Sequence, residues 1–205
     1  ILSRNIERMA VANALVTNED TAVLAKRFAH SFDKVLIDAP CSGEGMFRKS
    51  DDACEQWSEA NVAMCAERQW EILQNAFAAL RAGGVLLYST CTFNRSEDED
   101  IVARLMEESG DELVEAPEVS VGEEWGVVTG RVGVFQTFRF FPHRLTGEGM
   151  FMAVAMKAGE PGSRRRAPKS KRQTIAPVDK KSTEELSRWV VNPEQMRFFE
   201  AGDTM

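Results

Sequence analysis

Two short apolar runs, each followed by a turn that contains a cysteine, constrain this chain more than any other feature. The first run, residues 34–37, leads into Asp-Ala-Pro-Cys-Ser-Gly-Glu-Gly, and the second, residues 84–87, leads into Tyr-Ser-Thr-Cys-Thr. A segment long enough for a helix separates them. If the two runs are neighbouring parallel strands joined by that helix, Cys41 and Cys91 lie at the same edge of one sheet.

The spacing of apolar residues elsewhere predicts alternating helices and strands. Ser58 is the expected N-cap of a long amphipathic helix that runs to about Arg81 and is ended by Gly83 and Gly84. The two flanking runs are continuously apolar, which indicates buried strands. The other expected elements are helices at 1–13, 23–30 and 96–110, strands at 15–17, 113–115, 132–141 and 151–156, and a loop at 39–53.

This order of elements predicts an α/β fold with a Rossmann-like, doubly wound and mostly parallel sheet. The last two expected strands form an antiparallel pair at its C-terminal side. The chain begins with Ile1 rather than Met, and we expect it to be N-terminally truncated. The expected divisions are a Rossmann-like domain over 1–158, a basic linker over 159–181, and a further module or tail over 182–205.

Composition limits the cellular compartments and the kinds of partner that suit this chain. Hydrophobic residues make up 43% and charged residues 28%, and no apolar run is long enough to span a membrane, so we expect a cytoplasmic protein. The net charge of −7 hides a basic run from Lys157 to Lys181, which suits a phosphate backbone, although a solvated charged segment is the ordinary interpretation. Four cysteines without C-x-x-C spacing and two histidines indicate neither a disulfide framework nor a metal site.

Cys41 and Cys91 are the strongest candidates for chemistry. A cysteine at a strand end is most often a small buried hydrophobe, and we keep that interpretation for Cys54 and Cys65. Cys41 and Cys91 instead lie in turns rich in Pro, Ser, Thr and Gly, which place a thiol at the surface. Cys91 also precedes the helix expected from Ser96, whose N-terminus would lower the pKa of a nearby thiol.

Two thiols and the Asp38 carboxylate at one sheet edge match the needs of pyrimidine C5 alkylation. C5 of cytosine is a poor nucleophile until a thiolate adds at C6. A second thiol near C5 can then assist release of the product, and an acid that contacts N3 and N4 selects cytosine. The alternative for Asp38 is a strand-end carboxylate that caps the following loop.

The same residues resemble a known family. The motifs are Asn-Ile-Glu-Arg-Met at 5–9 leading to Val-Thr-Asn at 16–18, Asp-Ala-Pro-Cys-Ser-Gly-Glu-Gly-Met-Phe-Arg at 38–48, residues 69–84, Tyr-Ser-Thr-Cys-Thr-Phe at 88–93, Pro-His-Arg at 142–144 and Gly-Glu-Gly-Met-Phe at 147–151. Together they resemble the Nop/Sun family of S-adenosylmethionine-dependent RNA cytosine-5 methyltransferases, above all its bacterial RsmF-like branch, which acts on 16S rRNA. The resemblance covers roughly residues 5–157.

This resemblance implies a class I methyltransferase fold and an RNA partner, which we expect to be ribosomal. It implies that Cys91 is the nucleophile at C6, that Cys41 assists product release, and that Asp38 contacts the base or the cofactor. The target base has to be unstacked to expose C6.

The resemblance also implies S-adenosylmethionine as the cofactor. Asn18, Glu19 and Asp20 occupy the place where such families hold the adenine of the cofactor, and the resemblance does not choose among them. With Asp38 and Pro40, we take Asn18 and Asp20 as the cofactor-binding candidates. The glycine-rich loop that such families use for the cofactor has no counterpart here, since no G-x-G-x-x-G occurs in the sequence.

Four residues are candidates for substrate binding, each with a structural alternative. Ser42 and Gly43 can present backbone N–H groups to an anion, or form a plain tight loop. Phe93, like Phe47, can stack on a base or pack in the core. His143 can contact a phosphate or be an ordinary surface histidine.

Two other functions remain open from the sequence. A non-catalytic RNA-binding scaffold derived from such an enzyme would explain the missing cofactor loop, although a scaffold has no need of two exposed thiols. The thiols of Cys41 and Cys91 would also suit a redox sensor.

Overall fold

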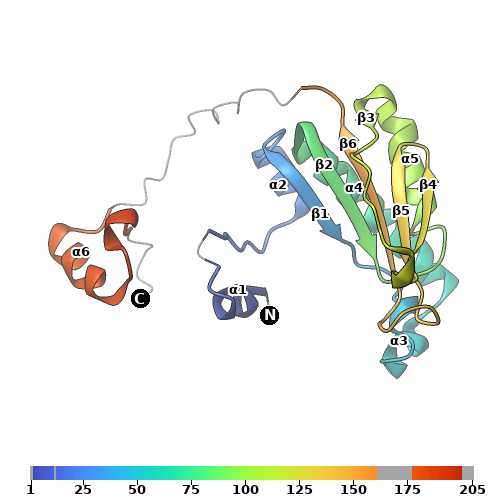
Figure 1. The fold of residues 1–205 in the computed structure, drawn as a ribbon, viewed down its shortest axis with the longest axis horizontal. Coiled ribbons are helices and arrows are strands. Elements are labelled where there is room, and N and C mark those ends of the chain that lie inside the picture. Colours follow the sequence, from blue (N-terminus) through green and yellow to red (C-terminus); the bar gives the residue numbers. More distant parts are fainter. Residues whose placement is uncertain (1, 12, 161–176, 200–205) are drawn as a thin grey trace. The chain divides into compact units, whose positions relative to one another are not determined.

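The computed structural model describes residues 2–11, 13–160 and 177–199 (Figure 1). The strands are β1 (Phe32–Asp38), β2 (Leu80–Thr90), β3 (Leu113–Val114), β4 (Val128–Val132), β5 (Phe135–Phe140) and β6 (Met150–Lys157). The α-helices are α1 (Leu2–Arg8), α2 (Thr21–Arg27), α3 (Asp51–Gln56), α4 (Glu59–Ala79), α5 (Glu99–Ser109) and α6 (Lys180–Leu186). Short 3-10 helices are η1 (Glu44–Met46), η2 (Gly110–Glu112), η3 (Glu123–Trp125), η4 (Ser187–Trp189) and η5 (Pro193–Gln195).

A mixed sheet brings the two cysteine motifs to one edge. Its strands lie in the order β1-β2-β6-β5-β4, and β3 pairs with β6 (Figure 1). β1 and β2 run parallel, as the sequence predicts, and Asp38 lies opposite Ser89. The other described pairings are antiparallel, and the predicted pair of C-terminal strands is β5 and β6. The part of the sheet that is parallel is therefore the part that carries the cysteine motifs.

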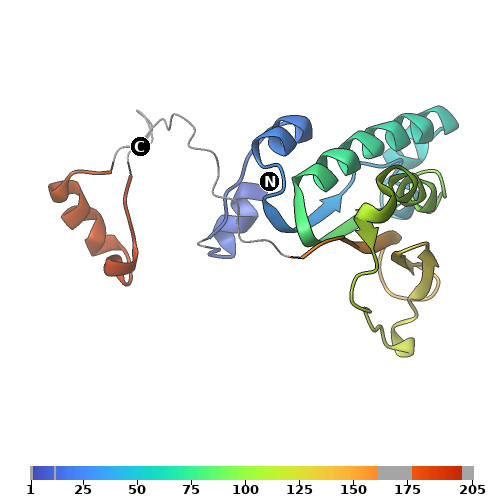
Figure 2. The same cartoon turned by 90° about the horizontal axis from the view of Figure 1, so that it is seen from above.

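Helix α4 connects the two parallel strands and covers one face of the sheet. Ser58 caps it as predicted, by accepting a hydrogen bond from the Asn61 N–H at 3.1 Å. Leu73 of α4 is fully buried in the core, which also contains Leu86 and Tyr88 of β2. Helices α2 and α5 pack on either side of α4 on the same face (Figure 2). This crossover makes β1 and β2 run in the same direction, so that both end at the same edge of the sheet.

Two expectations for strands are wrong. Residues 15–17 form no strand, and Leu15 is 84% exposed. A short β-branched run needs a hydrogen-bonded neighbour to become a strand, and no described strand pairs with this one. Strand β1 was expected to be buried, yet Leu36 is 69% exposed, because β1 is the edge of the described sheet and helices cover its other face.

Three boundaries also differ from the prediction. Helix α4 passes directly into β2, so Gly83 and Gly84 lie within the strand instead of ending the helix. The loop predicted for 39–53 contains η1 and the start of α3. The strand predicted for 132–141 begins later, as β5 at Phe135. Val132 ends β4, and a two-residue turn at Gly133, whose φ of +54° favours glycine, joins the two strands.

The chain divides into two compact units, Ile1–Arg164 and Arg165–Met205. In the second unit, Asp179 caps α6 by accepting a hydrogen bond from the Ser182 N–H at 3.0 Å. The end of the linker predicted for 159–181 is therefore helical, and its central basic residues lie outside the described residues. Over the described part of the chain, no helix combines the length and the hydropathy needed to cross a membrane.

Replacing Leu73 by Ala should lower the free energy of unfolding by about 2–5 kcal/mol, because it removes a fully buried side chain from between α4 and the sheet. Met64→Ala on the same helix is the matched control, since Met64 is 66% exposed and its loss should change stability by about 0.5 kcal/mol or less. Urea titration of the chain and both variants measures the difference. Equal losses in the two variants would contradict the packing of α4.

Candidate active site

The thiols of Cys41 and Cys91 meet where β1 and β2 end. Their sulfur atoms are 3.2 Å apart, within hydrogen-bond reach. The Cys91 N–H also donates to Cys41 Sγ at 3.3 Å. Both side chains are partly exposed, and no disulfide joins them. The predicted convergence of the two cysteines is confirmed, whereas Cys54 and Cys65 lie elsewhere, on α3 and α4.

Their contact shifts the pKa values of the two thiols in opposite directions. The hydrogen bond from the Cys41 thiol stabilises the Cys91 thiolate and lowers the pKa of Cys91 to about 7, although burial and the Asp38 charge oppose the shift. The same hydrogen bond and burial raise the pKa of Cys41 well above its usual value. Near neutral pH, Cys91 is therefore partly ionised and Cys41 keeps its proton. The neighbouring thiol, and not the helix N-terminus we expected, is the main cause.

The buried carboxylate of Glu97 holds the loop that carries Cys41. Glu97 Oε2 accepts hydrogen bonds from the Ser42 N–H at 2.9 Å and from Gln69 Nε2 at 2.7 Å, and Oε1 accepts one from Asn94 Nδ2 at 2.7 Å. Gln69 Nε2 also donates to the Pro40 carbonyl at 2.9 Å. Both Glu97 and Gln69 are fully buried. The first cysteine loop is thus fixed from α4 and from the segment before α5.

A second carboxylate, that of Glu44, joins the two cysteine loops. It accepts hydrogen bonds from the Phe93 N–H at 2.9 Å and from Trp57 Nε1 at 3.1 Å. The Gly45 N–H donates to the Cys91 carbonyl at 2.8 Å. A Cβ atom on Gly45 would lie only 2.6 Å from the Gly149 carbonyl oxygen, so glycine is needed for this close approach of backbones.

Arg139 of β5 ties the second cysteine loop to the start of α5. Its guanidinium donates to both Glu99 oxygens, at 2.8 and 2.6 Å, and to the Phe93 carbonyl at 3.2 Å. Its Nη2 also lies 3.1 Å from Asp98 Oδ2. Burial raises the pKa of Asp98 to about 8. The Asp98 carboxyl group accepts a hydrogen bond at 2.6 Å from the hydroxyl of Thr90, the residue before Cys91.

The residues expected to bind substrate fall into two groups. Ser42 is buried, and its hydroxyl lies 3.1 Å from that of Thr92 and accepts a hydrogen bond from Asn94, which favours a role in shaping the loop. Gly43 has a φ of +78° and is the N-cap of η1, as a tight turn requires. Phe93 and His143 lie in one row of stacked rings, described below. Their contact with a substrate stays a prediction.

The residues expected to bind a cofactor do not lie together. Asp38 and Pro40 are exposed at the sheet edge beside the thiols, and within the described residues no hydrogen bond or ion pair engages the Asp38 carboxylate. Asp20 instead caps α2 by accepting a hydrogen bond from the Ala22 N–H at 2.8 Å. Asn18 precedes it in an exposed segment. The role of all four in cofactor binding stays a prediction.

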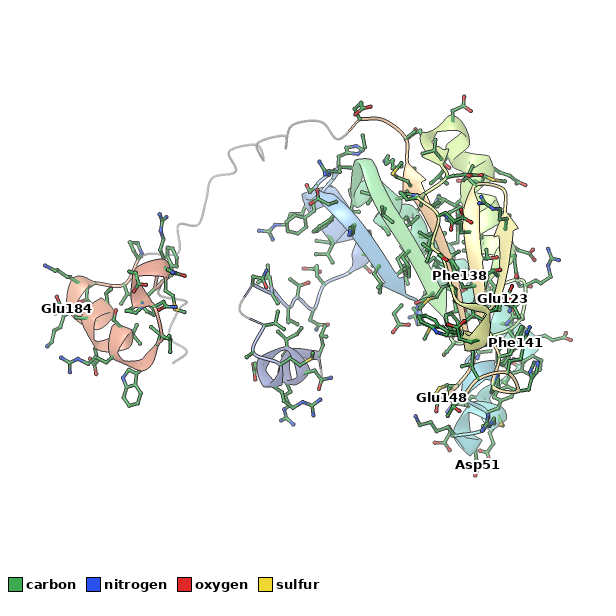
Figure 3. The ribbon with its side chains drawn as sticks, viewed as in Figure 1. Asp51, Glu123, Phe138, Phe141, Glu148 and Glu184 are labelled. Atoms are coloured by element: carbon green, nitrogen blue, oxygen red, sulfur yellow. The ribbon has the colours of Figure 1, made fainter. Side chains whose placement is uncertain are left out.

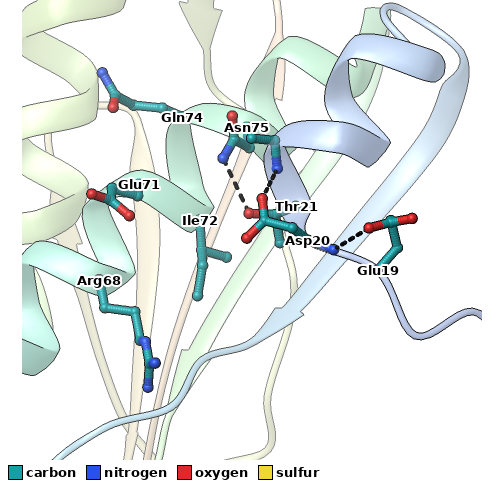
Figure 4. A pocket seen from close by; sticks show the side chains of 9 residues that line it. Glu19, Asp20, Thr21, Arg68, Glu71, Ile72, Gln74 and Asn75 are labelled. Carbon is teal, nitrogen blue, oxygen red and sulfur yellow. Dashed lines mark hydrogen bonds between the residues drawn. The ribbon is translucent and has the colours of Figure 1, made fainter.

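Asp20 lines a pocket of about 490 Å³ between the start of α2 and the side of α4 (Figure 4). Thr21 accepts a hydrogen bond from Asn75 across its rim at 3.1 Å, and Arg68 and Glu71 face the same space. This pocket is separate from the pair of thiols, which does not line it. Among the residues the structure describes, no cluster of three or more His, Cys, Asp or Glu side chains could hold a metal ion.

Sequence reasoning missed the residues that fix the site. Gln69 lies among the apolar residues of the long helix predicted from Ser58, and Glu97 lies at the start of the helix predicted for 96–110. A glutamine inside an apolar stripe was the available signal, because a buried amide needs a polar partner. The identity of that partner, 28 residues away, leaves no mark in the local pattern.

Comparison with known proteins gives concordant matches. A family model described as 16S rRNA methyltransferase RsmB/F matches residues 1–156. Ribosomal RNA small subunit methyltransferase F of Shewanella loihica is 35% identical over 190 residues, which cover 91% of this chain and 38% of that protein. The protein of the same name from Vibrio parahaemolyticus is 34% identical, with 94% of this chain and 40% of that protein covered. The chain thus spans about two fifths of the length of these curated relatives.

Solved structures support the expected Rossmann-like α/β fold. NSun6 from Pyrococcus horikoshii, in a crystal structure with SFG, matches with a TM-score of 0.62 and 28% identity over 78% of this chain and 38% of that chain. A methyltransferase homolog protein from Pyrococcus horikoshii matches with a TM-score of 0.55 and 23% identity, over 76% of this chain and 48% of that chain, and supports the fold alone.

Alkylation of Cys91 by iodoacetamide should rise with pH around a midpoint near 7, because only the thiolate reacts. Cys41→Ala removes the hydrogen-bond donor, so the midpoint should move up toward the ordinary thiol value and the rate at pH 7 should fall about 10-fold. Mass spectrometry of the peptide that contains Cys91 measures both. Cys54→Ser, which changes an exposed thiol, should leave the midpoint unchanged. A midpoint that stays near 7 in Cys41→Ala would contradict the assigned cause.

Gly45→Ala should lower the free energy of unfolding by about 1–3 kcal/mol, because the new methyl group meets backbone atoms that cannot rotate away. Gly130→Ala is the control, since its Cβ would meet only the Thr137 hydroxyl, at 3.0 Å. Thermal or urea unfolding of both variants measures the difference. A Gly45→Ala variant as stable as the unchanged chain would show that the loops are not held this closely.

Proposed function

Because the chain belongs to the 16S rRNA methyltransferase RsmB/F family, we propose that it carries the catalytic thiols for methylation of C5 of a cytosine in ribosomal RNA. The observation that carries the proposal is the 3.2 Å separation of Cys41 Sγ and Cys91 Sγ at the sheet edge, with one thiol activated by the other. A pair of structural cysteines needs no such difference in acidity.

Cys91 is the nucleophile. Its thiolate adds to C6 of an unstacked cytosine, a new S–C6 bond forms, and the electron pair of the C5=C6 bond moves to C5. C5 then takes up the methyl group. Loss of the C5 proton and cleavage of the S–C6 bond restore the C5=C6 bond and return Cys91 as a thiolate. A pKa of about 7 suits this thiol to both steps, since it attacks and leaves at neutral pH.

Cys41 assists the second half of the reaction. In the free protein its proton is held by the contact with Cys91 and by burial. Once the Cys91 sulfur is bonded to C6 it is uncharged, so the repulsion that keeps Cys41 protonated disappears. Cys41 can then give its proton to solvent, accept the proton from C5, and return to the starting state as the Cys91 sulfur departs.

We propose S-adenosylmethionine as the methyl donor, as the motifs at both cysteines imply. When bound, it supplies an electrophilic methyl group. The exposed and unengaged carboxylate of Asp38 fits such a ligand, because it can accept hydrogen bonds from an amino group beside the thiols. Pro40 is exposed at the same edge, and Asn18 and Asp20 are the candidates for the adenine. The match to the NSun6 structure with SFG supports the choice of S-adenosylmethionine as the cofactor.

Replacing Cys91 by Ser should abolish formation of a covalent protein–RNA complex, whereas Cys41→Ser should accumulate one, because the adduct forms and cannot be resolved. Methyl transfer should fall by about 10²–10⁴-fold in Cys41→Ser. Denaturing gel electrophoresis after incubation with unmodified 16S rRNA transcript and S-adenosylmethionine detects the complex. Cys54→Ser is the matched control and should show no accumulation.

Two outcomes would overturn the assigned roles. Methyl transfer that persists in Cys91→Ser would show that Cys91 is not the nucleophile. A Cys41→Ser variant that traps no RNA would leave the scaffold interpretation as the better one, since a scaffold binds RNA without forming an adduct.

A further inference from the structure

A row of three stacked rings leads from the Cys91 loop to the surface. Phe93 stacks on Phe141, with ring centroids 5.7 Å apart and planes inclined by 26°. Phe141 stacks in turn on His143, at 5.4 Å and 30°. Figure 3 shows Phe141 at the same end of the unit as Glu148 and the helix α3. The row begins two residues after Cys91 and ends at an exposed histidine.

The inner ring of this row is held firmly. The Phe93 N–H donates to the Glu44 carboxylate at 2.9 Å, and the Phe93 carbonyl accepts a hydrogen bond from Arg139 at 3.2 Å. The ring lies against the backbone of Gly149, where any Cβ atom would overlap it. A partner that stacks on the outer end therefore meets a row that is already ordered, which reduces the entropic cost of binding.

The outer ring, that of His143, presents an open face. Phe141 stacks with both of the other rings, whereas His143 stacks with Phe141 alone among the described residues and is exposed. Within residues 2–11 and 13–160, no hydrogen bond or ion pair engages the His143 ring. Arg144, the next residue, is an exposed cation, and Glu148 of the same loop pairs with exposed Lys49 at 3.3 Å. An aromatic face with cations beside it is the chemistry that recognises a single-stranded nucleic acid.

We propose that the outer face of His143 is a stacking platform for an RNA base adjacent to the target cytosine. This rests on the proposed function and adds a subsite to it. Removal of the target base from its stack leaves its neighbour in the strand without a stacking partner. The ring row supplies a replacement partner at a fixed position relative to Cys91. Stacking, rather than the phosphate contact considered from the sequence, is therefore the role of His143.

The test is the affinity of the chain for an unmodified 16S rRNA transcript, measured by filter binding over a range of salt concentrations. His143→Ala should weaken binding roughly 5- to 100-fold, as expected for loss of one base–aromatic stack. His143→Phe keeps a flat ring and should stay within about 3-fold of the unchanged chain. Thr146→Ala, an exposed change on the same loop, is the control and should have no effect.

The salt dependence separates stacking from a phosphate contact. If His143 stacks, the slope of log affinity against log salt is the same in His143→Ala as in the unchanged chain. A slope reduced by about 0.7, or a loss in His143→Phe equal to that in His143→Ala, would overturn the proposal. So would unchanged binding by His143→Ala, or no measurable binding by the unchanged chain. Adduct formation by Cys41→Ser is read separately, so failure of the catalytic roles is distinguishable from failure of the platform.

Discussion

The hydrogen bonds to the buried carboxylate of Glu97 are the interaction on which the site depends. A carboxylate removed from water is stable only if its oxygens are satisfied, and here Ser42, Gln69 and Asn94 satisfy them. Those donors come from the first cysteine loop, from helix α4 and from the second cysteine loop. The requirement to satisfy one charge thus fixes three segments at once, and the contact between the two thiols follows from their positions.

The fixed contact turns two chemically identical side chains into different reagents. The Cys41 thiol is stabilised in its protonated form, and the Cys91 thiolate is stabilised by the hydrogen bond that Cys41 donates. Neither effect needs a histidine or a metal. A distance of 3.2 Å between two sulfur atoms is sufficient, provided that the surrounding backbone does not let them separate.

Three features could be predicted from the sequence: the parallel strand pair, the crossover helix with its Ser58 cap, and the contact of Cys41 with Cys91. Each has a local signature in apolar runs, caps and turns. The sequence did not predict the roles of Gln69 and Glu97, since a buried hydrogen bond between distant residues has no periodicity. Residues 15–17 were misassigned for a related reason: β-branched residues indicate a strand only if a neighbour is present to pair with them.

The site draws on β1, β2 and the β5–β6 loop, because the backbone of Gly45 contacts both the Cys91 carbonyl and, across a gap of about a hundred residues, Gly149. Bringing such distant segments together carries an entropic cost of loop closure. Until β1 and β2 pair and bring Cys41 to Cys91, neither sulfur has the neighbour that shifts its pKa. A chain in which this pairing has not formed therefore exposes no activated thiol to electrophiles in its surroundings.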